Sequence, residues 1–394
     1  MVVRTPQQFK EMQDIEVKTE HRVTKIDPKG KRIEIVNLST FETQWVSYDK
    51  LIIATGARSR RLNLPGSNAK NIFTLKDLQD GIRIREYIDE NKPQQVAILG
   101  GGFIALEMCE AFRLRNIETY VFCRRDLPAG NLEGEVSEKI LKELEENGVH
   151  FLPYHEPVAF ELNSNGKVRS FKTTKGIYPV DIVLMAVGVI PNVEMAKEAG
   201  IELGKTGAIK TDFAQMTNLM NVYAAGDCCE VFNLVSEDWI HTSLGDIANK
   251  QGRVAGENAA GGMATFPGVV GSAAFKVFEL EVAFTGLGTQ IALRYGFDVD
   301  SQVIEAESKV GYMPGSKRIL IKLIFDRSSG RLLGAQMAGK EGVARRINAL
   351  AVTLHQKMTI DEISRLDFAY APPFSAPFDP ILIAAEQATK KIQR

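Results

Sequence analysis

QQVAILGGGFIALEMCEAFRLRN, residues 94–116, is the stretch that decides the fold. An apolar run ends in three glycines, and a helical pattern begins directly after them. Gly100 permits a tight turn, Gly102 leaves room for a pyrophosphate beside the backbone, and Ala105 lets helix and strand pack closely. The helix N-terminus adds amide donors and the positive end of its dipole. The segment therefore predicts a strand–turn–helix unit that binds a dinucleotide; the alternative is a glycine-rich turn between packed elements.

Further apolar runs of the same kind recur along the chain, and each is closed by a glycine or a turn. Near-continuous hydrophobic strands are typical of parallel sheets that are covered on both faces. The runs span residues 50–56, 118–123, 181–188 and 221–227, and helical patterns span 103–116 and 135–148. This alternation of strands and helices predicts an α/β fold with a doubly wound sheet.

The two ends of the chain have a different hydrophobic pattern. Short alternating strands around a DPKGK turn predict a β-meander in the first fifty residues. After Pro267 the pattern indicates antiparallel strands, followed by helices at 341–356 and from about Asp379. We predict a discontinuous α/β region at 1–78 and 196–262, a nucleotide domain at 79–195, and an α+β terminal domain at 263–394.

Composition excludes several classes of protein. The 394 residues carry 48 Lys and Arg against 49 Asp and Glu, so no global basic field attracts nucleic acid or an anionic membrane. No apolar run approaches the ~20 residues of a membrane helix. Four cysteines do not make a disulfide framework, so we expect a reducing cytoplasm. The histidines and cysteines show no metal-ligand spacing, and no metal site is expected.

The end of the 118–123 strand bears on the choice of coenzyme. An acid at this place would bind the free 2′-hydroxyl of NADH, but Cys123 occupies it and Arg124 and Arg125 follow. Guanidinium groups pair with phosphate, which favours the 2′-phosphate of NADPH over NADH. The alternative is that both arginines are solvated surface residues.

Four ordered segments carry a resemblance to a known family. They are IIATGARSRRLNLPG (52–66), GGGFIALE (100–107), LMAVGVIPN (184–192) and VYAAGDCCE (222–230). The sequence resembles the pyridine nucleotide-disulfide oxidoreductases, which have two Rossmann-like dinucleotide-binding domains and a C-terminal dimerisation domain. The ending DFAYAPPFSAPFDPILIAAEQA (367–388) resembles the branch of coenzyme A-disulfide reductases, NADH oxidases and NADH peroxidases.

The resemblance implies an FAD site in the discontinuous first region. Thr55 and Gly56 match a turn beside the FAD diphosphate. Gly226 lets the cofactor approach, and Asp227 matches the acid that accepts a ribitol hydroxyl. Ala248 matches a helix-start position whose amide faces the flavin pyrimidine, where partial positive charge stabilises a reduced flavin.

The same resemblance implies an NAD(P)H site in the domain at 79–195, built on Gly100 and Gly102 with Ile104 beside them. Gly188 matches the glycine that borders the nicotinamide pocket. Glu107 matches an acid near the nicotinamide ring; the alternative is an ordinary exposed helix residue.

Tyr312 and Tyr370 resemble two tyrosines that coenzyme A-disulfide reductases bring to the active site from the partner subunit. A phenol there hydrogen-bonds or protonates a leaving sulfur; the alternative is packing at an interface. The resemblance therefore implies a homodimer and a small disulfide or persulfide substrate of the coenzyme A type.

One departure from the family pattern matters. Its members begin with a strand–GxGxxG–helix unit for FAD and a helix with the redox cysteine, and this chain shows neither. We expect that about 60 residues upstream belong to the native protein, an FAD-dependent NAD(P)H:disulfide oxidoreductase. The alternatives are an NADH oxidase or peroxidase and a non-catalytic nucleotide-binding or dimerising fragment. Cys109, Cys123, Cys228 and Cys229 do not replace the missing cysteine, and we expect them to be small hydrophobic residues.

Overall fold

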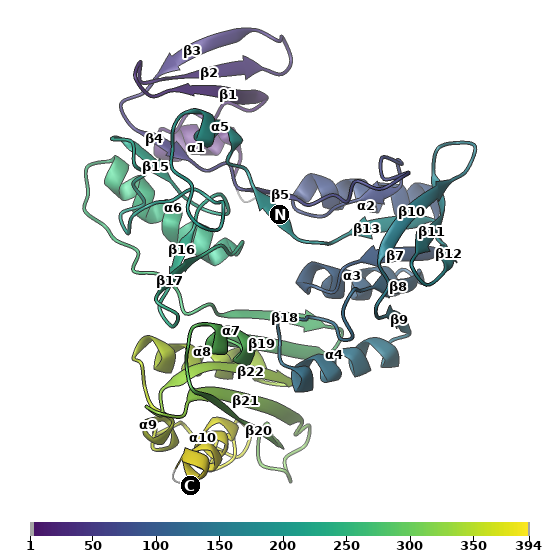
Figure 1. The fold of residues 1–394 in the computed structure, drawn as a ribbon, viewed down its shortest axis with the longest axis vertical. Helices are drawn as coiled ribbons and strands as arrows, with labels where there is room; N and C mark the ends of the chain where they lie inside the picture. The colour runs from purple at the N-terminus through teal and green to yellow at the C-terminus, as the bar shows by residue number, and fades with distance from the viewer. Residues whose placement is uncertain (1–3, 393–394) are drawn as a thin grey trace. The chain divides into compact units, whose positions relative to one another are not determined.

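Residues 4–392 are described by the computed structural model (Figure 1). The chain divides into two units, each made of discontinuous segments. The first comprises Met1–Ala57, Pro191–Phe232 and Trp239–Gly268, and the second comprises Arg58–Ile190, Asn233–Asp238 and Val269–Arg394.

The second unit contains a five-stranded parallel sheet in the order β6-β13-β7-β8-β9. Its central strand β7 is buried from Val96 to Leu99, because helices pack on one face of the sheet and a small antiparallel sheet packs on the other. The strands are β6 (Ile72–Phe73), β7 (Gln95–Leu99), β8 (Glu118–Phe122), β9 (Val149–Leu152) and β13 (Ile182–Met185). The helices are α2 (Leu78–Asn91), α3 (Phe103–Arg113) and α4 (Gly134–Glu146). The strand–turn–helix prediction for residues 94–116 is confirmed.

A small antiparallel sheet, β10 (Pro157–Leu162), β11 (Val168–Thr173) and β12 (Ile177–Pro179), lies beside it. Buried Asn71 joins the two sheets. Its amide nitrogen donates to the Val168 and Asp181 carbonyls at 3.0 and 2.8 Å, and its oxygen accepts from the Val168 amide at 2.8 Å. One side chain therefore satisfies three backbone groups where no ladder reaches them.

The rest of the second unit is an antiparallel sheet in the order β18-β19-β22-β21-β20. Its strands are β18 (Ala273–Val277), β19 (Leu280–Gly286), β20 (Val299–Glu307), β21 (Arg318–Asp326) and β22 (Leu332–Gly339). The odd-numbered residues of β21 from Ile319 to Leu323 pack into a core with α8 (Val343–His355) and α10 (Pro380–Ile392), while Leu320 packs with α4. The remaining helices are α7 (Thr289–Arg294) and α9 (Ile360–Ser364).

Helix α4 connects the two five-stranded sheets of the second unit. Its inward residues Val136, Ile140 and Leu144 share one hydrophobic core with Val96 of the parallel sheet and Leu320 of the antiparallel sheet. Each buried side chain of this size stabilises the fold by roughly 1.5–3 kcal/mol. The sheets therefore form a single packed body.

The first unit carries the predicted meander, β1 (His21–Asp27), β2 (Arg32–Asn37) and β3 (Thr43–Ser47), in antiparallel order. Strand β4 (Leu51–Ile53) pairs in parallel with β15 (Val222–Ala224). Its helices are α1 (Pro6–Gln13), α5 (Glu194–Glu198) and α6 (Gly245–Ala259). Four further short strands each cross a boundary between segments of the two units: β5 (Ala57–Ser59), β14 (Val189–Pro191), β16 (Val231–Asn233) and β17 (Asp238–Ile240).

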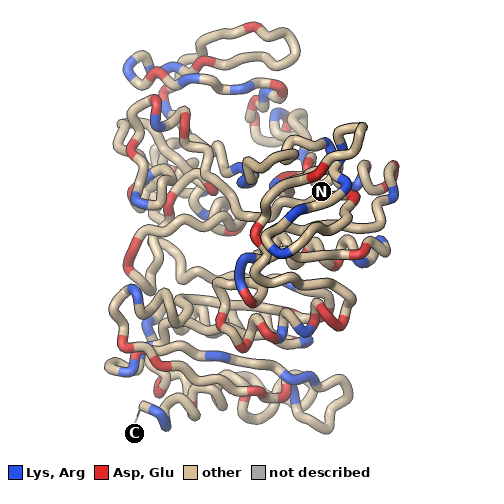
Figure 2. The backbone as a smooth tube through the Cα atoms, turned by 45° about the vertical axis from the view of Figure 1, so that its right-hand side comes forward, with Lys and Arg blue, Asp and Glu red and all other residues tan. Residues whose placement is uncertain are grey.

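Charge is distributed evenly along the chain, with acidic and basic residues intermixed (Figure 2). Within residues 4–392, no helix is both long and apolar enough to cross a bilayer.

Replacing Asn71 by Leu tests the joint between the two sheets. The change leaves three buried backbone groups unpaired, so we expect a loss of about 2–4 kcal/mol of stability. The measurement is the midpoint of thermal unfolding by circular dichroism. Asn91→Ala removes an exposed amide that bonds only to Tyr87 and Lys167 and is the matched control. Equal midpoints for the two variants would contradict the assignment.

Candidate nucleotide-binding sites

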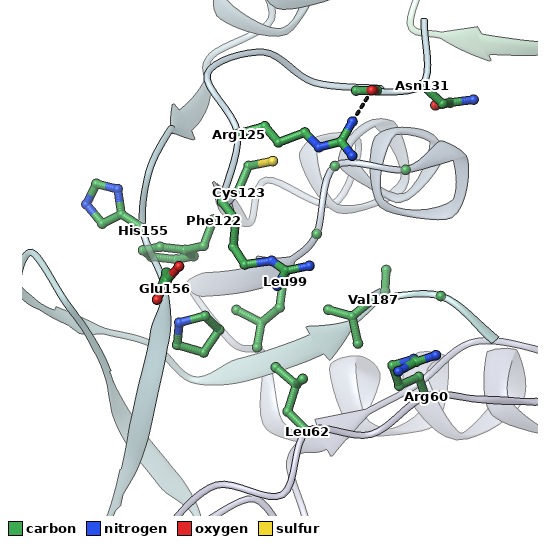
Figure 3. A pocket seen from close by; sticks show the side chains of 18 of the residues that line it. Arg60, Leu62, Leu99, Phe122, Cys123, Arg125, Asn131, His155, Glu156 and Val187 are labelled. Carbon is green, nitrogen blue, oxygen red and sulfur yellow. Dashed lines mark hydrogen bonds between the residues drawn. The ribbon is translucent and has the colours of Figure 1, made fainter. Parts of the chain in front are cut away.

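A cavity of about 840 Å³ opens at the carboxyl ends of the parallel strands (Figure 3). We call it the nucleotide pocket. Segments distant in sequence form its walls, because parallel strands end at the same edge of a sheet. Its lining includes Arg60, Leu62, Leu99, residues 100–102, Phe122, residues 123–125, Asn131, His155, Glu156 and residues 186–189.

The glycine turn forms the floor of the pocket. Gly100 has φ 108°, and a Cβ atom there would overlap the Ala186 carbonyl oxygen. Gly102 is the N-cap of α3 with φ −83°, and an added Cβ would meet no atom within 4 Å. The first glycine is therefore required by the protein backbone, whereas the second leaves open space in front of the helix amides. This arrangement suits a pyrophosphate.

Cys123 and the two arginines lie together at the end of β8, as expected. Cys123 is buried, and its amide donates to the Leu152 carbonyl at 3.0 Å. Arg124 is exposed at the pocket. Arg125 donates a hydrogen bond to the Gly130 carbonyl, so part of its guanidinium is engaged within its own loop (Figure 3).

Gly188 also lines the pocket. It has φ 103°, and its carbonyl accepts from the Arg60 amide at 2.9 Å. This bond places Arg60 on the side of the pocket away from Arg125 (Figure 3). Sequence reasoning missed Arg60, which lies in the quoted RSRR segment but had no motif position of its own.

His155 is a second lining residue that sequence reasoning missed. Its Nδ1 lies 2.8 Å from the Pro153 carbonyl and its Nε2 lies 2.7 Å from the Tyr178 hydroxyl. A ring that donates from Nδ1 and accepts at Nε2 satisfies both partners. Phe122 packs edge-on against both rings. This aromatic cluster fixes the wall that carries Glu156.

Ile104 and Glu107 do not line the nucleotide pocket as its described residues define it. Both are exposed on α3. Partial desolvation raises the pKa of Glu107 above its usual value.

The residues predicted for FAD lie in the first unit. The Thr55 hydroxyl donates to the Asn192 carbonyl at 2.7 Å, and the Asn192 side chain donates to the Thr55 carbonyl at 2.9 Å. The Asn192 amide also donates to the Gly56 carbonyl at 2.9 Å. Gly56 has φ 64°, a conformation that favours glycine. Asn192, the last residue of the VIPN motif, therefore holds the turn that follows β4.

Gly226 and Asp227 follow β15 and face α6. A Cβ on Gly226 would lie 3.5 Å from the Ala248 side chain, and the Gly226 amide donates to Gln251 at 3.0 Å. His241 approaches the Asp227 carbonyl at 2.8 Å. Sequence reasoning identified neither Gln251 nor His241.

The amide of Ala248 donates to the Leu244 carbonyl at 3.0 Å and is part of the helix ladder. The amides without an intrahelical acceptor at this end of α6 are those of residues 245–247. They supply the partial positive charge that suits an electron-rich ring system such as a flavin.

Cys228 is fully buried beside the Thr55 turn, with its Sγ 3.6 Å from the Sγ of Cys229. The Cys229 thiol, the Thr55 hydroxyl and the amides of Thr55 and Gly56 lower the pKa of Cys228 to about 6, although burial opposes the shift. Burial and the neighbouring Cys228 raise the pKa of Cys229. The pKa values of the two adjacent thiols are therefore shifted in opposite directions.

Tyr312 and Tyr370 lie in exposed loops of the second unit, and neither is among the described residues that line the nucleotide pocket. Arg346 links the two loops. It donates to the Ser308 carbonyl at 2.7 Å and to the Asp379 carboxylate at 2.9 Å.

Gly100→Ala and Gly102→Ala separate the two roles of the glycine turn. Gly100→Ala forces its Cβ against a carbonyl, so we expect lower thermal stability as well as lost coenzyme binding. Gly102→Ala fits the protein and fills only the space for a pyrophosphate. We expect unchanged thermal stability and NAD(P)H affinity reduced by about tenfold or more. Calorimetric melting and titration with NADPH check both. Equal effects of the two substitutions on stability would contradict this division.

Comparisons with known proteins identify the family of this chain. A profile described as pyridine nucleotide-disulphide oxidoreductase matches residues 3–245, and its dimerisation-domain profile matches residues 272–379. An NADH oxidase of Methanocaldococcus jannaschii is 34% identical over all of this chain and 87% of its own length. An NAD(P)H coenzyme A polysulfide/persulfide reductase of Pyrococcus horikoshii is 35% identical over 86% of this chain and 75% of its own length.

Other relatives are named coenzyme A disulfide reductase. Among solved structures, the NAD-dependent persulfide reductase from A. fulgidus superposes with a TM-score of 0.95 at 36% identity, over all of this chain and 72% of its own. Both profiles match in order, and the Methanocaldococcus jannaschii relative aligns over all of this chain, so this chain belongs to the pyridine nucleotide-disulphide oxidoreductase family.

Proposed function

We propose that this protein uses NAD(P)H to reduce a small disulfide or persulfide of the coenzyme A type, with NADPH as the preferred coenzyme and with FAD as the intermediate redox group. The observation that carries the proposal is the nucleotide pocket, where a glycine turn, a helix N-terminus and Arg124 lie together. The substrate class rests on the names of the relatives.

The chain's residues divide the work between two sites. Gly102 and the α3 amides bind the coenzyme pyrophosphate, and Arg124 pairs with a 2′-phosphate. In the first unit, the Asn192-held turn at Thr55 and the amides at 245–247 fit FAD. When bound, FAD accepts a hydride and passes on electrons singly or in pairs. The thiol that attacks the substrate is not assigned to any of the four cysteines, which are all buried.

We further propose that the matched dimerisation domain forms a homodimer in which Tyr370 and Tyr312 of one subunit approach the substrate site of the other. The exposure of both phenols, 49% and 76%, supports this role. A phenol so placed donates a hydrogen bond to the leaving sulfur.

Incubation of the purified protein with FAD, NADPH and coenzyme A disulfide tests the proposed reaction. We expect NADPH oxidation, followed at 340 nm, and release of free thiol in a 2:1 ratio to NADPH. Thiol-independent consumption of oxygen would instead favour an NADH oxidase, which is the name of the Methanocaldococcus jannaschii relative, and consumption of hydrogen peroxide would favour a peroxidase. Absence of NAD(P)H binding would overturn both.

Arg124→Ala tests the coenzyme preference. Loss of one charge-assisted contact to the 2′-phosphate is expected to lower kcat/KM for NADPH by about tenfold or more and to leave NADH within about twofold. Arg115→Ala is the control, because Arg115 is an exposed arginine paired with Asp89 away from the pocket. An equal loss for NADPH and NADH would contradict recognition of a 2′-phosphate.

A further inference from the structure

One ionic cluster lies outside the nucleotide pocket but contacts the C-terminal end of a loop that lines the pocket. We call residues 124–132, between β8 and α4, the coenzyme loop; Arg124, Arg125, Gly130 and Asn131 line the pocket. The middle of the loop is fixed by the Ala129 amide, which donates to the Gly101 carbonyl at 2.7 Å. The residue that follows the loop is Glu133, the N-cap of α4.

Glu133 is held by the terminal domain rather than by its own helix. Lys322 of β21 approaches its carboxylate at 2.8 Å. The amide and hydroxyl of Thr289, at the start of α7, donate to the same carboxylate at 2.8 and 2.9 Å. The carboxylate therefore has three donors from two elements of the other domain.

The backbone of Glu133 is fixed from the same side. Its amide donates to Gln336 of β22 at 2.7 Å. Gln336 lies directly opposite Lys322 in the β21–β22 ladder, so one cross-strand pair holds both the backbone and the side chain of this residue.

The cluster is buried and charged. The side chains of Lys322 and Glu133 are 9% and 13% exposed, and Lys322 also bonds to Glu135 at 3.0 Å. Burial disfavours both charges, but it is outweighed by Lys322 and Thr289 together at Glu133 and by Glu133 and Glu135 together at Lys322. The pKa of Glu133 therefore lies below its usual value and that of Lys322 above. Removal of Lys322 would leave the Glu133 carboxylate largely buried without a counter-charge, which is destabilising locally.

We infer that Glu133, Lys322, Thr289 and Gln336 form a positioning anchor that sets the coenzyme loop, and through it the affinity for NAD(P)H. The inference rests on the proposed function and deepens it, since it assigns part of coenzyme binding to the terminal domain. None of the four residues touches the pocket, so each acts by holding Arg124 and its neighbours in place.

The other end of α4 provides a matched control. Lys340, at the end of the antiparallel sheet, pairs with buried Glu143 at 3.0 Å. Glu143 also accepts the Glu279 amide at 3.1 Å. This pair joins the same helix to the same domain, but it lies more than two turns from the coenzyme loop.

The experiment compares Lys322→Met with Lys340→Met by NADPH titration, steady-state kinetics and thermal melting. Lys322→Met is expected to raise the Kd and KM for NADPH about five- to tenfold with kcat within about twofold, since uniform binding is lost. Lys340→Met is expected to lower the melting temperature and to leave Kd within about twofold. Lys322→Arg should restore most of the affinity.

A double variant provides a second readout. Glu133→Gln with Lys322→Met should weaken NADPH binding no more than the worse single variant, because both break one interaction. If Lys322→Met does not fold, Thr289→Val removes only the hydroxyl donor and is expected to raise Kd about two- to threefold.

Each outcome decides a different claim. If the unaltered protein binds NADPH and Lys322→Met, or Thr289→Val in its place, binds it equally well, the anchor is refuted and the proposed function stands. If Lys340→Met weakens binding as much as Lys322→Met, helix docking and not the anchor is responsible. If the unaltered protein does not bind NAD(P)H, both proposals fall.

Discussion

The packing of α4 against two sheets is the constraint on which the second unit depends. Val136, Ile140 and Leu144 complete the core of the parallel sheet and, with Leu320, that of the antiparallel sheet. Such a helix has no free apolar face, so its position is determined from both sides. The coenzyme loop, which precedes α4, therefore has a fixed C-terminal end. The geometry of the nucleotide pocket is thus partly a property of the terminal domain.

Both candidate nucleotide sites are built on turns that bring the protein backbone close to the ligand. A backbone that approaches a phosphate or a ring must do so without a Cβ atom, and its turn must be held without a regular ladder. In the nucleotide pocket Gly102 leaves this space open, and in the first unit Gly226 has a positive φ, a conformation that favours glycine. Side-chain amides hold the turns of the first unit, with Asn192 on one segment and Gln251 on the other.

Local sequence patterns predicted much of the fold and the position of the glycine turn. Strand β7, the glycine turn and α3 follow from apolar periodicity and glycine chemistry within 23 residues, and the meander, the parallel strands and the antiparallel terminal sheet were also predicted correctly. Asn192, Gln251 and His155 were missed, because their roles depend on partners that only the fold brings near; Thr55 and Asn192 are 137 positions apart. The Gly130 contact of Arg125 was invisible for a similar reason, since loop conformation carries no periodic signal.

The contacts of Arg346 bear on which parts of the terminal domain can change in sequence and length. Its guanidinium ties the base of the Tyr312 loop to the base of the Tyr370 loop, through the Ser308 carbonyl and the Asp379 carboxylate. Asp379 also accepts the amide of Ile381 in the first turn of α10. Because Arg346 joins the two loop bases, the tip of either loop can change in length or sequence without displacing the helices. Under the proposed function, substrate range is therefore open to change by exchange of these loops while the scaffold stays constant.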